Sequence, residues 1–96
     1  GVNVFPSQIE EHILSCAALA PHFQIELTRP GRMDQVRVMV ERRAEANDDE
    51  GARDGKHLAH RIKTMIGISV AVDVRPTGAI ERSAGKVSRV IDLRPR

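Results

Sequence analysis

Three stretches of the chain alternate apolar and polar side chains, and this alternation constrains the fold more than any other feature. A period of two indicates a β-strand that buries one face and turns the other toward solvent. Pro30 and Gly31 lie between the first two stretches and favour a turn, so we expect an antiparallel hairpin with a loop longer than a tight turn. The alternating stretches are 23–27, 36–40 and 70–74.

Before the hairpin, a helix is predicted from about Ser7 to Leu19, where apolar residues recur at helical spacing. Ser7 and Glu10 have the spacing of a capping box, which satisfies backbone donors at a helix start. Pro21 is expected to end this helix, because proline lacks the N–H that the next helical turn would need.

After the hairpin, a charged connection at 42–53 shows no apolar periodicity beyond alanine. A second helix is therefore predicted to begin between Ala52 and Gly55. Gly67 stands where a C-cap glycine belongs. The expected apolar face of this helix consists of Leu58, Ile62, Met65 and Ile66.

With a short strand at 2–5, the predicted order becomes β-α-β-β-α-β, followed by further chain. This is the split βαβ pattern of ferredoxin-like α+β folds. We expect one domain with a four-stranded antiparallel sheet and two helices on one face. The core would span 1–75, and a basic tail would occupy 76–96.

Composition narrows the classes of partner. The chain has only two aromatic residues, Phe5 and Phe23, which argues against an RNA-reading sheet that stacks bases. Its single cysteine, Cys16, excludes an internal disulfide and favours a buried thiol in a reducing, cytoplasmic compartment. No apolar run approaches the ~20 residues of a membrane span. Neither a nucleic acid nor a membrane is therefore a predicted partner.

Side chains that could bind metal or act as nucleophiles give little support for a site of their own. His57 and His60 are three residues apart on the second predicted helix, but a metal site needs further ligands. The acidic run at 47–50 lacks the alternating spacing of a calcium loop. No metal site is predicted, and no arrangement of nucleophile and base supports a hydrolase.

The C-terminal end of the chain is its basic part. Residues 75–96 carry a net charge of +4, whereas the first 74 residues carry −2. This asymmetry favours an anionic partner. Lys86 is one of only three lysines and follows Gly85 in a small-residue stretch, where its ammonium could reach a phosphate or carboxylate oxygen. Composition alone favours the alternative, a solvated surface lysine.

Two terminal motifs give the chain a family resemblance: GVNVFPSQIEEHIL at 1–14 and ERSAGKVSRVIDLR at 81–94. Together, in this order and spacing, they resemble the C-terminal domain of phenylacetate–CoA ligases. Those enzymes belong to the adenylate-forming superfamily of acyl-CoA synthetases. The segments between the motifs are similar to the same domain, so the resemblance covers essentially the whole chain.

The resemblance implies an acid–thiol ligase that forms an acyl-adenylate from ATP and then an acyl-CoA thioester. Lys86 matches the lysine that acts in adenylation. Gly1, Val2 and Asn3 match a segment that lines the channel for coenzyme A, through backbone contact. Arginines of the tail could meet coenzyme A phosphates, with none assigned.

The resemblance also implies what lies outside the chain. The principal partner would be an N-terminal adenylation domain of the same protein, which would hold Mg²⁺ and an aryl carboxylic acid. A homodimer of the full enzyme is allowed. The chain, which starts without Met, would be a piece of that protein. By itself, this piece would be inactive and would bind no cofactor. The alternative is a stand-alone ferredoxin-like module for ligand sensing or protein interaction, with Lys86 incidental.

Overall fold

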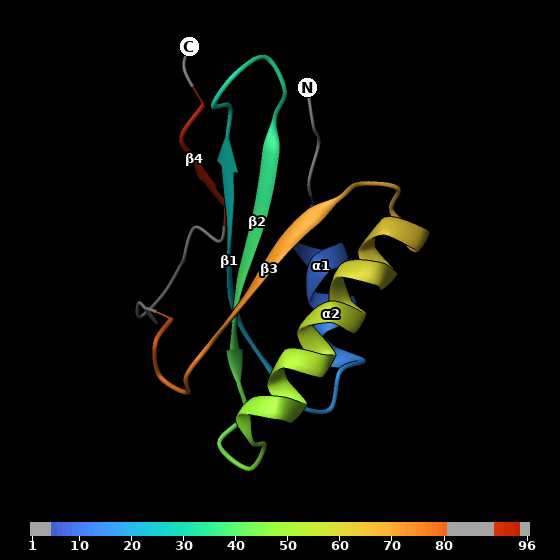
Figure 1. Cartoon of the computed structure of the whole chain (residues 1–96), viewed down its shortest axis with the longest axis vertical. Coiled ribbons are helices and arrows are strands. Elements are labelled where there is room, and N and C mark those ends of the chain that lie inside the picture. Colours follow the sequence, from blue (N-terminus) through green and yellow to red (C-terminus); the bar gives the residue numbers. More distant parts are fainter. Residues whose placement is uncertain (1–4, 81–89, 95–96) are drawn as a thin grey trace.

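The computed structural model describes residues 5–80 and 90–94 (Figure 1). Its four strands form one sheet in the order β3-β2-β1-β4, and both helices lie on one side of this sheet (Figure 1). The elements are α1 (Pro6–Leu14), β1 (Leu19–Thr28), β2 (Gln35–Arg42), α2 (Asp48–Met65), β3 (Val70–Arg75) and β4 (Val90–Asp92).

The aliphatic core lies between the helices and the covered face of the sheet. In the antiparallel pair of β1 and β2, Ile25 lies opposite Val38, which confirms the predicted hairpin. Because side chains alternate along a strand, every second residue of β1 and β2 meets the helices. The core cluster consists of Ile9, Ile13, Cys16, Leu19, Phe23, Ile25, Leu27, Val36, Val38, Val40, Leu58 and Ile62.

The sheet is mixed, so the predicted antiparallel sheet is wrong. β3 pairs in parallel with β2, and β4 pairs in parallel with β1. A parallel pair needs a crossover connection, and α2 supplies it between β2 and β3. The α+β class, a sheet of four strands and two helices on one face hold, but β4 lies in the segment that was predicted as a tail. The ferredoxin-like arrangement does not follow, because a period of two fixes which face is buried and leaves the partner's direction open.

The first helix begins without the predicted capping box. Phe5 is the N-cap residue, and no side chain caps the helix there. Pro6 occupies the first turn, where its fixed φ suits the helix and its missing N–H costs nothing. Ser7 and Glu10 therefore do not define the start. Most of the predicted strand at 2–5 lies outside the described residues, which begin at Phe5.

The first helix also ends earlier than predicted, at Leu14, and Leu19 already belongs to β1. The backbone N–H of Ala18 donates to Asp54 Oδ2 at 2.8 Å, which ties the intervening turn to α2. Pro21 lies inside β1, where the pairing with β2 is irregular. Tertiary contacts thus outweighed the helical spacing, and the irregular pairing accommodates a residue without an N–H.

The second helix begins earlier than predicted, at Asp48, because a capping box precedes it. Asn47 Oδ1 accepts from the Glu50 N–H at 2.8 Å, and Glu50 Oε1 accepts from the Asn47 N–H at 2.9 Å. These two bonds satisfy backbone donors that the first turn leaves open. The charged connection at 42–53 is therefore partly helical.

The predicted apolar face of α2 holds only in part. Leu58 and Ile62 are fully buried, whereas Met65 is 67% exposed. Gly67 ends the helix as predicted, with a φ of +90° that favours glycine. Its N–H donates to the Lys63 carbonyl at 3.1 Å. Within the part of the chain that the structure describes, no helix is both long and apolar enough to cross a membrane.

Candidate functional site

The predicted site residues fall outside the described ranges 5–80 and 90–94. Lys86 lies in the gap, and Gly1, Val2 and Asn3 precede the first described residue. The structure does describe the two places where the chain around Lys86 joins the sheet. We call residues 76–80 with Glu41 the upstream attachment, and residues 90–94 with Arg29 and Asp34 the downstream attachment.

The upstream attachment is centred on a buried carboxylate. Glu41, near the end of β2, has an exposed fraction of 0%. Its Oε1 accepts from the Gly78 N–H at 2.9 Å, and its Oε2 accepts from the Ile80 N–H at 3.0 Å. Both carboxylate oxygens thus hold backbone donors of the loop that leaves β3. A buried carboxylate without such partners would cost several kcal/mol.

The loop in this attachment is a tight turn. The Ala79 N–H donates to the Pro76 carbonyl at 3.1 Å, and Gly78 has a φ of +86°, as the third position of a type II turn requires. The Thr77 hydroxyl donates to the Arg42 carbonyl at 2.7 Å. Ile80 closes the loop with 7% of its surface exposed. The turn is therefore fixed to β2 through both polar and apolar contacts.

Sequence reasoning missed Glu41 for a clear reason. Along β2, Val36, Val38 and Val40 face the helices, so Glu41 falls on the opposite face. On a two-layer domain that face is normally solvated. In Figure 1 the loop after β3 turns away from the side occupied by both helices, and its bonds to Glu41 place it over this face.

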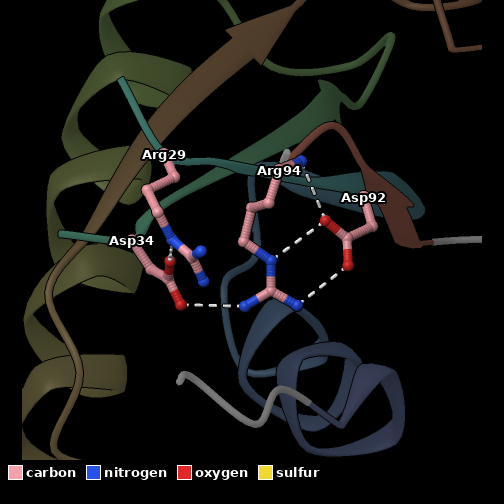
Figure 2. Close-up of polar contacts among 4 residues, drawn as sticks. All are labelled: Arg29, Asp34, Asp92 and Arg94. Carbon is pink, nitrogen blue, oxygen red and sulfur yellow. Dashed lines mark hydrogen bonds and ion pairs between the residues drawn. The ribbon is translucent and has the colours of Figure 1, made fainter. Parts of the chain in front are cut away.

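The downstream attachment is a network of ion pairs at the other end of the hairpin (Figure 2). Arg94 donates to both oxygens of Asp92, at 2.9 Å from Nε and 2.8 Å from one terminal nitrogen. Its other terminal nitrogen donates to Asp34 at 2.8 Å. Asp34 also accepts from Arg29 Nε at 2.7 Å. The network therefore ties the chain after β4 to both sides of the β1–β2 loop.

Charge pairing sets the titration of this network. The side-chain hydrogen bond from Arg94, followed by the bond from its backbone N–H, lowers the pKa of Asp92 to about 2. The bonds to Asp92 and then to Asp34 raise the pKa of Arg94. The pair stays charged at neutral pH. Because all three guanidinium nitrogens of Arg94 are engaged, its role here is to fasten the chain.

A separate depression of about 500 Å³ lies between the turn after α1 and the first turns of α2. Cys16 lines it but is only 3% exposed, which confirms the predicted buried thiol. Burial raises the pKa of this thiol, so it is a weak nucleophile. His57 lines the same depression.

No group of three His, Cys, Asp or Glu side chains suited to a metal ion occurs among residues 5–80 and 90–94.

Comparison with known proteins defines the class. The family model described as "AMP-binding enzyme C-terminal domain" matches residues 1–94, so the chain belongs to this family. It is 44% identical over 97 residues to a phenylacetate–coenzyme A ligase of Escherichia coli, and 47% identical over 98 residues to one of Pseudomonas putida. Each match covers 98% of this chain but only 22% of the relative. The predicted family is therefore confirmed.

Solved structures agree with this assignment. A domain of phenylacetate–coenzyme A ligase from Bacteroides vulgatus superposes with a TM-score of 0.84 at 33% identity, covering 99% of this chain and 89% of that one. A 2-hydroxyisobutyryl-CoA ligase, in complex with 2-HIB-AMP and CoA in the thioesterification state, also gives a TM-score of 0.84 at 26% identity. That match covers 96% of this chain and 20% of the ligase.

Proposed function

We propose that this chain is the mobile C-terminal domain of an ATP-dependent aryl-acid CoA ligase of the phenylacetate type. The observation that carries the proposal is the match to phenylacetate–coenzyme A ligases over 98% of the chain. The chain spans about a fifth of the length of those relatives. The acyl pocket, the nucleotide site and the Mg²⁺ site then belong to an N-terminal adenylation domain of the same protein.

Lys86 is the catalytic residue that this domain supplies in the first step. The substrate carboxylate attacks the α-phosphorus of ATP, an acyl-adenylate forms, and pyrophosphate leaves. Negative charge gathers on the oxygens between the carboxylate and the α-phosphate. The Lys86 ammonium neutralises that charge, and this stabilises the transition state more than the bound substrates.

The second step uses a different part of the domain. The thiol of coenzyme A attacks the acyl carbon of the adenylate, a thioester forms, and AMP leaves. The backbone of Gly1, Val2 and Asn3 lines the channel for the pantetheine arm. Support for this role comes from the GVNVFP motif, because a glycine allows close approach of a ligand to the backbone.

The test is Lys86→Ala in the full-length ligase, with phenylacetate as the acid. Acid-dependent ATP–pyrophosphate exchange should fall at least about 100-fold, because a contact made in the transition state is lost. Thioester formation from supplied phenylacetyl-adenylate should stay within about twofold of the parent value, since that step bypasses adenylation. An equal loss in both half-reactions would contradict the role given to Lys86.

Lys63→Ala is the matched control. Lys63 is an exposed lysine on α2, in the last turn of the helix. Its loss removes the same charge from the domain at a position 23 residues before Lys86. Both half-reactions should keep the parent rates. A comparable fall of exchange in this control would mean that net charge, and not the position of Lys86, matters.

A further test uses the 96-residue chain alone. Calorimetry with ATP, coenzyme A and phenylacetate should detect no tight binding, because this domain supplies only part of each site. A tight complex with any of the three would instead favour a self-contained ligand-binding module.

A further inference from the structure

We propose that Glu41 is a positioning residue for the adenylation half-reaction, because it fixes the point from which the chain departs toward Lys86. This inference rests on the proposed function of Lys86. It extends that function to a side chain that makes no contact with substrate. Its direct evidence is the pair of hydrogen bonds from Gly78 and Ile80 to the two oxygens of one fully buried carboxylate.

The chemistry of Glu41 is unusual for its place in the sheet. Among the described residues, Glu41 is the charged side chain with no exposed surface. Burial of a carboxylate is costly, and apolar side chains of similar size would pack here without that cost. What the carboxylate provides is two acceptors aimed at backbone donors two residues apart. An apolar side chain cannot fix the path of a loop in this way.

Chain length links this contact to Lys86. Ile80 precedes Lys86 by six residues, so the two Cα atoms are at most about 20 Å apart. Val90, paired with Ile25 of β1, follows Lys86 by four residues, a reach of at most about 14 Å. Glu41 and β1 thus hold the described residues on either side of the Lys86 segment, Ile80 and Val90. If Glu41 releases Gly78 and Ile80, the nearest upstream residue still bonded to β2 is Thr77, whose hydroxyl donates to the Arg42 carbonyl, nine residues before Lys86.

The size of the expected effect follows from two limits. Losing the Glu41 contact lengthens the sequence separation between the two anchors around Lys86 from ten residues, Ile80 to Val90, to thirteen, Thr77 to Val90. A longer tether by itself would dilute the lysine by less than about twofold. A positioned catalytic group loses far more when it is misplaced, up to about 100-fold for a shift of 1 Å. A positioning role thus predicts a loss clearly beyond twofold, of about tenfold.

The experiment is Glu41→Gln in the full-length ligase. The substitution keeps the side-chain size, but it replaces one acceptor oxygen by an NH₂ group that faces a backbone N–H. ATP–pyrophosphate exchange with phenylacetate should fall about tenfold. Thioester formation from supplied phenylacetyl-adenylate should stay within about twofold. Equal losses in both half-reactions, or a loss of exchange of twofold or less, would overturn the proposal.

Glu26→Gln is the matched control. Glu26 lies on the same face of the sheet and pairs with Arg37 at 3.1 Å. Its side chain is partly exposed, and within the described residues its ion pair is with Arg37 and not with residues 76–80. Both half-reactions should keep the parent rates in this variant. A tenfold loss of exchange there as well would show that any carboxylate of this face matters, and the special role of Glu41 would fail.

A double variant separates this inference from the proposed function. In a Lys86→Ala background, Glu41→Gln should lower the exchange no further, because a residue that acts through Lys86 has nothing left to position. A further loss would show that Glu41 acts by another route and would overturn the inference. If Lys86→Ala alone leaves the exchange intact, the proposed function fails. If Lys86→Ala abolishes exchange and Glu41→Gln does not, only the inference about Glu41 fails.

Discussion

The upstream and downstream attachments join one stretch of chain to the same sheet by opposite means. The upstream attachment uses a carboxylate with no exposed surface, bonded to backbone N–H groups. The downstream attachment uses side-chain ion pairs, in which Arg94 is 20% exposed and Asp92 48% exposed. A buried contact is little affected by solvent, whereas an exposed ion pair is screened by salt.

The difference indicates which end of the Lys86 segment is held by contacts that salt and acid weaken. Breaking a buried, bonded carboxylate leaves two donors without partners inside the protein, so the loss is large. Breaking the pair between Arg94 and Asp92 leaves a carboxylate that is 48% exposed and can bind water, so the loss is small. We therefore expect the upstream end to stay fixed until the domain unfolds, and the downstream end to respond to salt and acid.

The largest effect on stability is expected for Glu41→Ala. It leaves the N–H groups of Gly78 and Ile80 without acceptors and should lower the free energy of unfolding by about 3 kcal/mol. Urea unfolding of the chain measures this value. Glu26→Ala, which removes a partly exposed ion pair, should cost less than about 1 kcal/mol. Equal costs for both variants would remove the contrast between the two kinds of contact.

Asp34→Ala should have an intermediate effect. The Asp34 side chain is 6% exposed and accepts from both Arg29 and Arg94, but Arg94 keeps its two bonds to Asp92. We expect the free energy of unfolding to fall by about 1.5 kcal/mol. Hydrogen exchange should show faster opening at Leu93, whose N–H donates to the Leu27 carbonyl at 2.8 Å. A cost equal to that of Glu41→Ala would show that the two attachments are equally strong.

High salt should affect the amide exchange rates of the two attachments differently, and this test needs no substitution. At about 1 M ionic strength the Debye length falls to about 3 Å, which weakens exposed ion pairs. Exchange of the Leu93 amide should speed up severalfold relative to low salt, while the Ile80 amide, bonded to Glu41, should keep its protection. Equal responses of the two amides would show that exposure does not distinguish the attachments.

Acid should have the smallest effect on the stability of the folded state. Whether stability rises or falls with pH follows from the pKa of Asp92. Arg94 holds the pKa of Asp92 at about 2, below the usual value of 3.8. A carboxyl with a lowered pKa stabilises the folded state fully above its usual pKa. This contribution is lost as the pH falls through about 2. The Asp92 carboxyl signal in NMR should therefore titrate near pH 2 in the parent chain and nearer 3.8 in Arg94→Ala. A titration near 3.8 in both would disprove the pairing in solution.

Much of the scaffold could be predicted because it depends on local patterns. The alternation of Ile25 and Val38 with polar neighbours gave the hairpin and its buried face, and Gly67 marked the end of α2. The predicted helix ends were wrong where a contact with a distant segment outweighed the local sequence pattern. The N–H of Ala18 is bound by Asp54, from α2, so the first helix stops well before Pro21.

Strand direction could not be predicted for a related reason. The pairing of β4 with β1 joins residues far apart in the sequence, such as Val90 and Ile25, and nothing in either strand alone selects a parallel partner. The residues proposed for function differ in the same respect. Lys86 was singled out by its motif and remains a prediction, whereas Glu41 carries no local signal at all.

The sequence by itself determined the family, through its two terminal motifs, and also the presence of two helices and the aliphatic face of the sheet, which depend on spacing within single segments. Only the tertiary structure decided the mixed order of strands and the two attachments around Lys86. The physical reason is that the same polar residue in the sequence can lie on a solvated face of the sheet or on a face that another segment covers. Whether Glu41 meets water or two backbone N–H groups depends on where a loop some 37 residues later crosses the sheet.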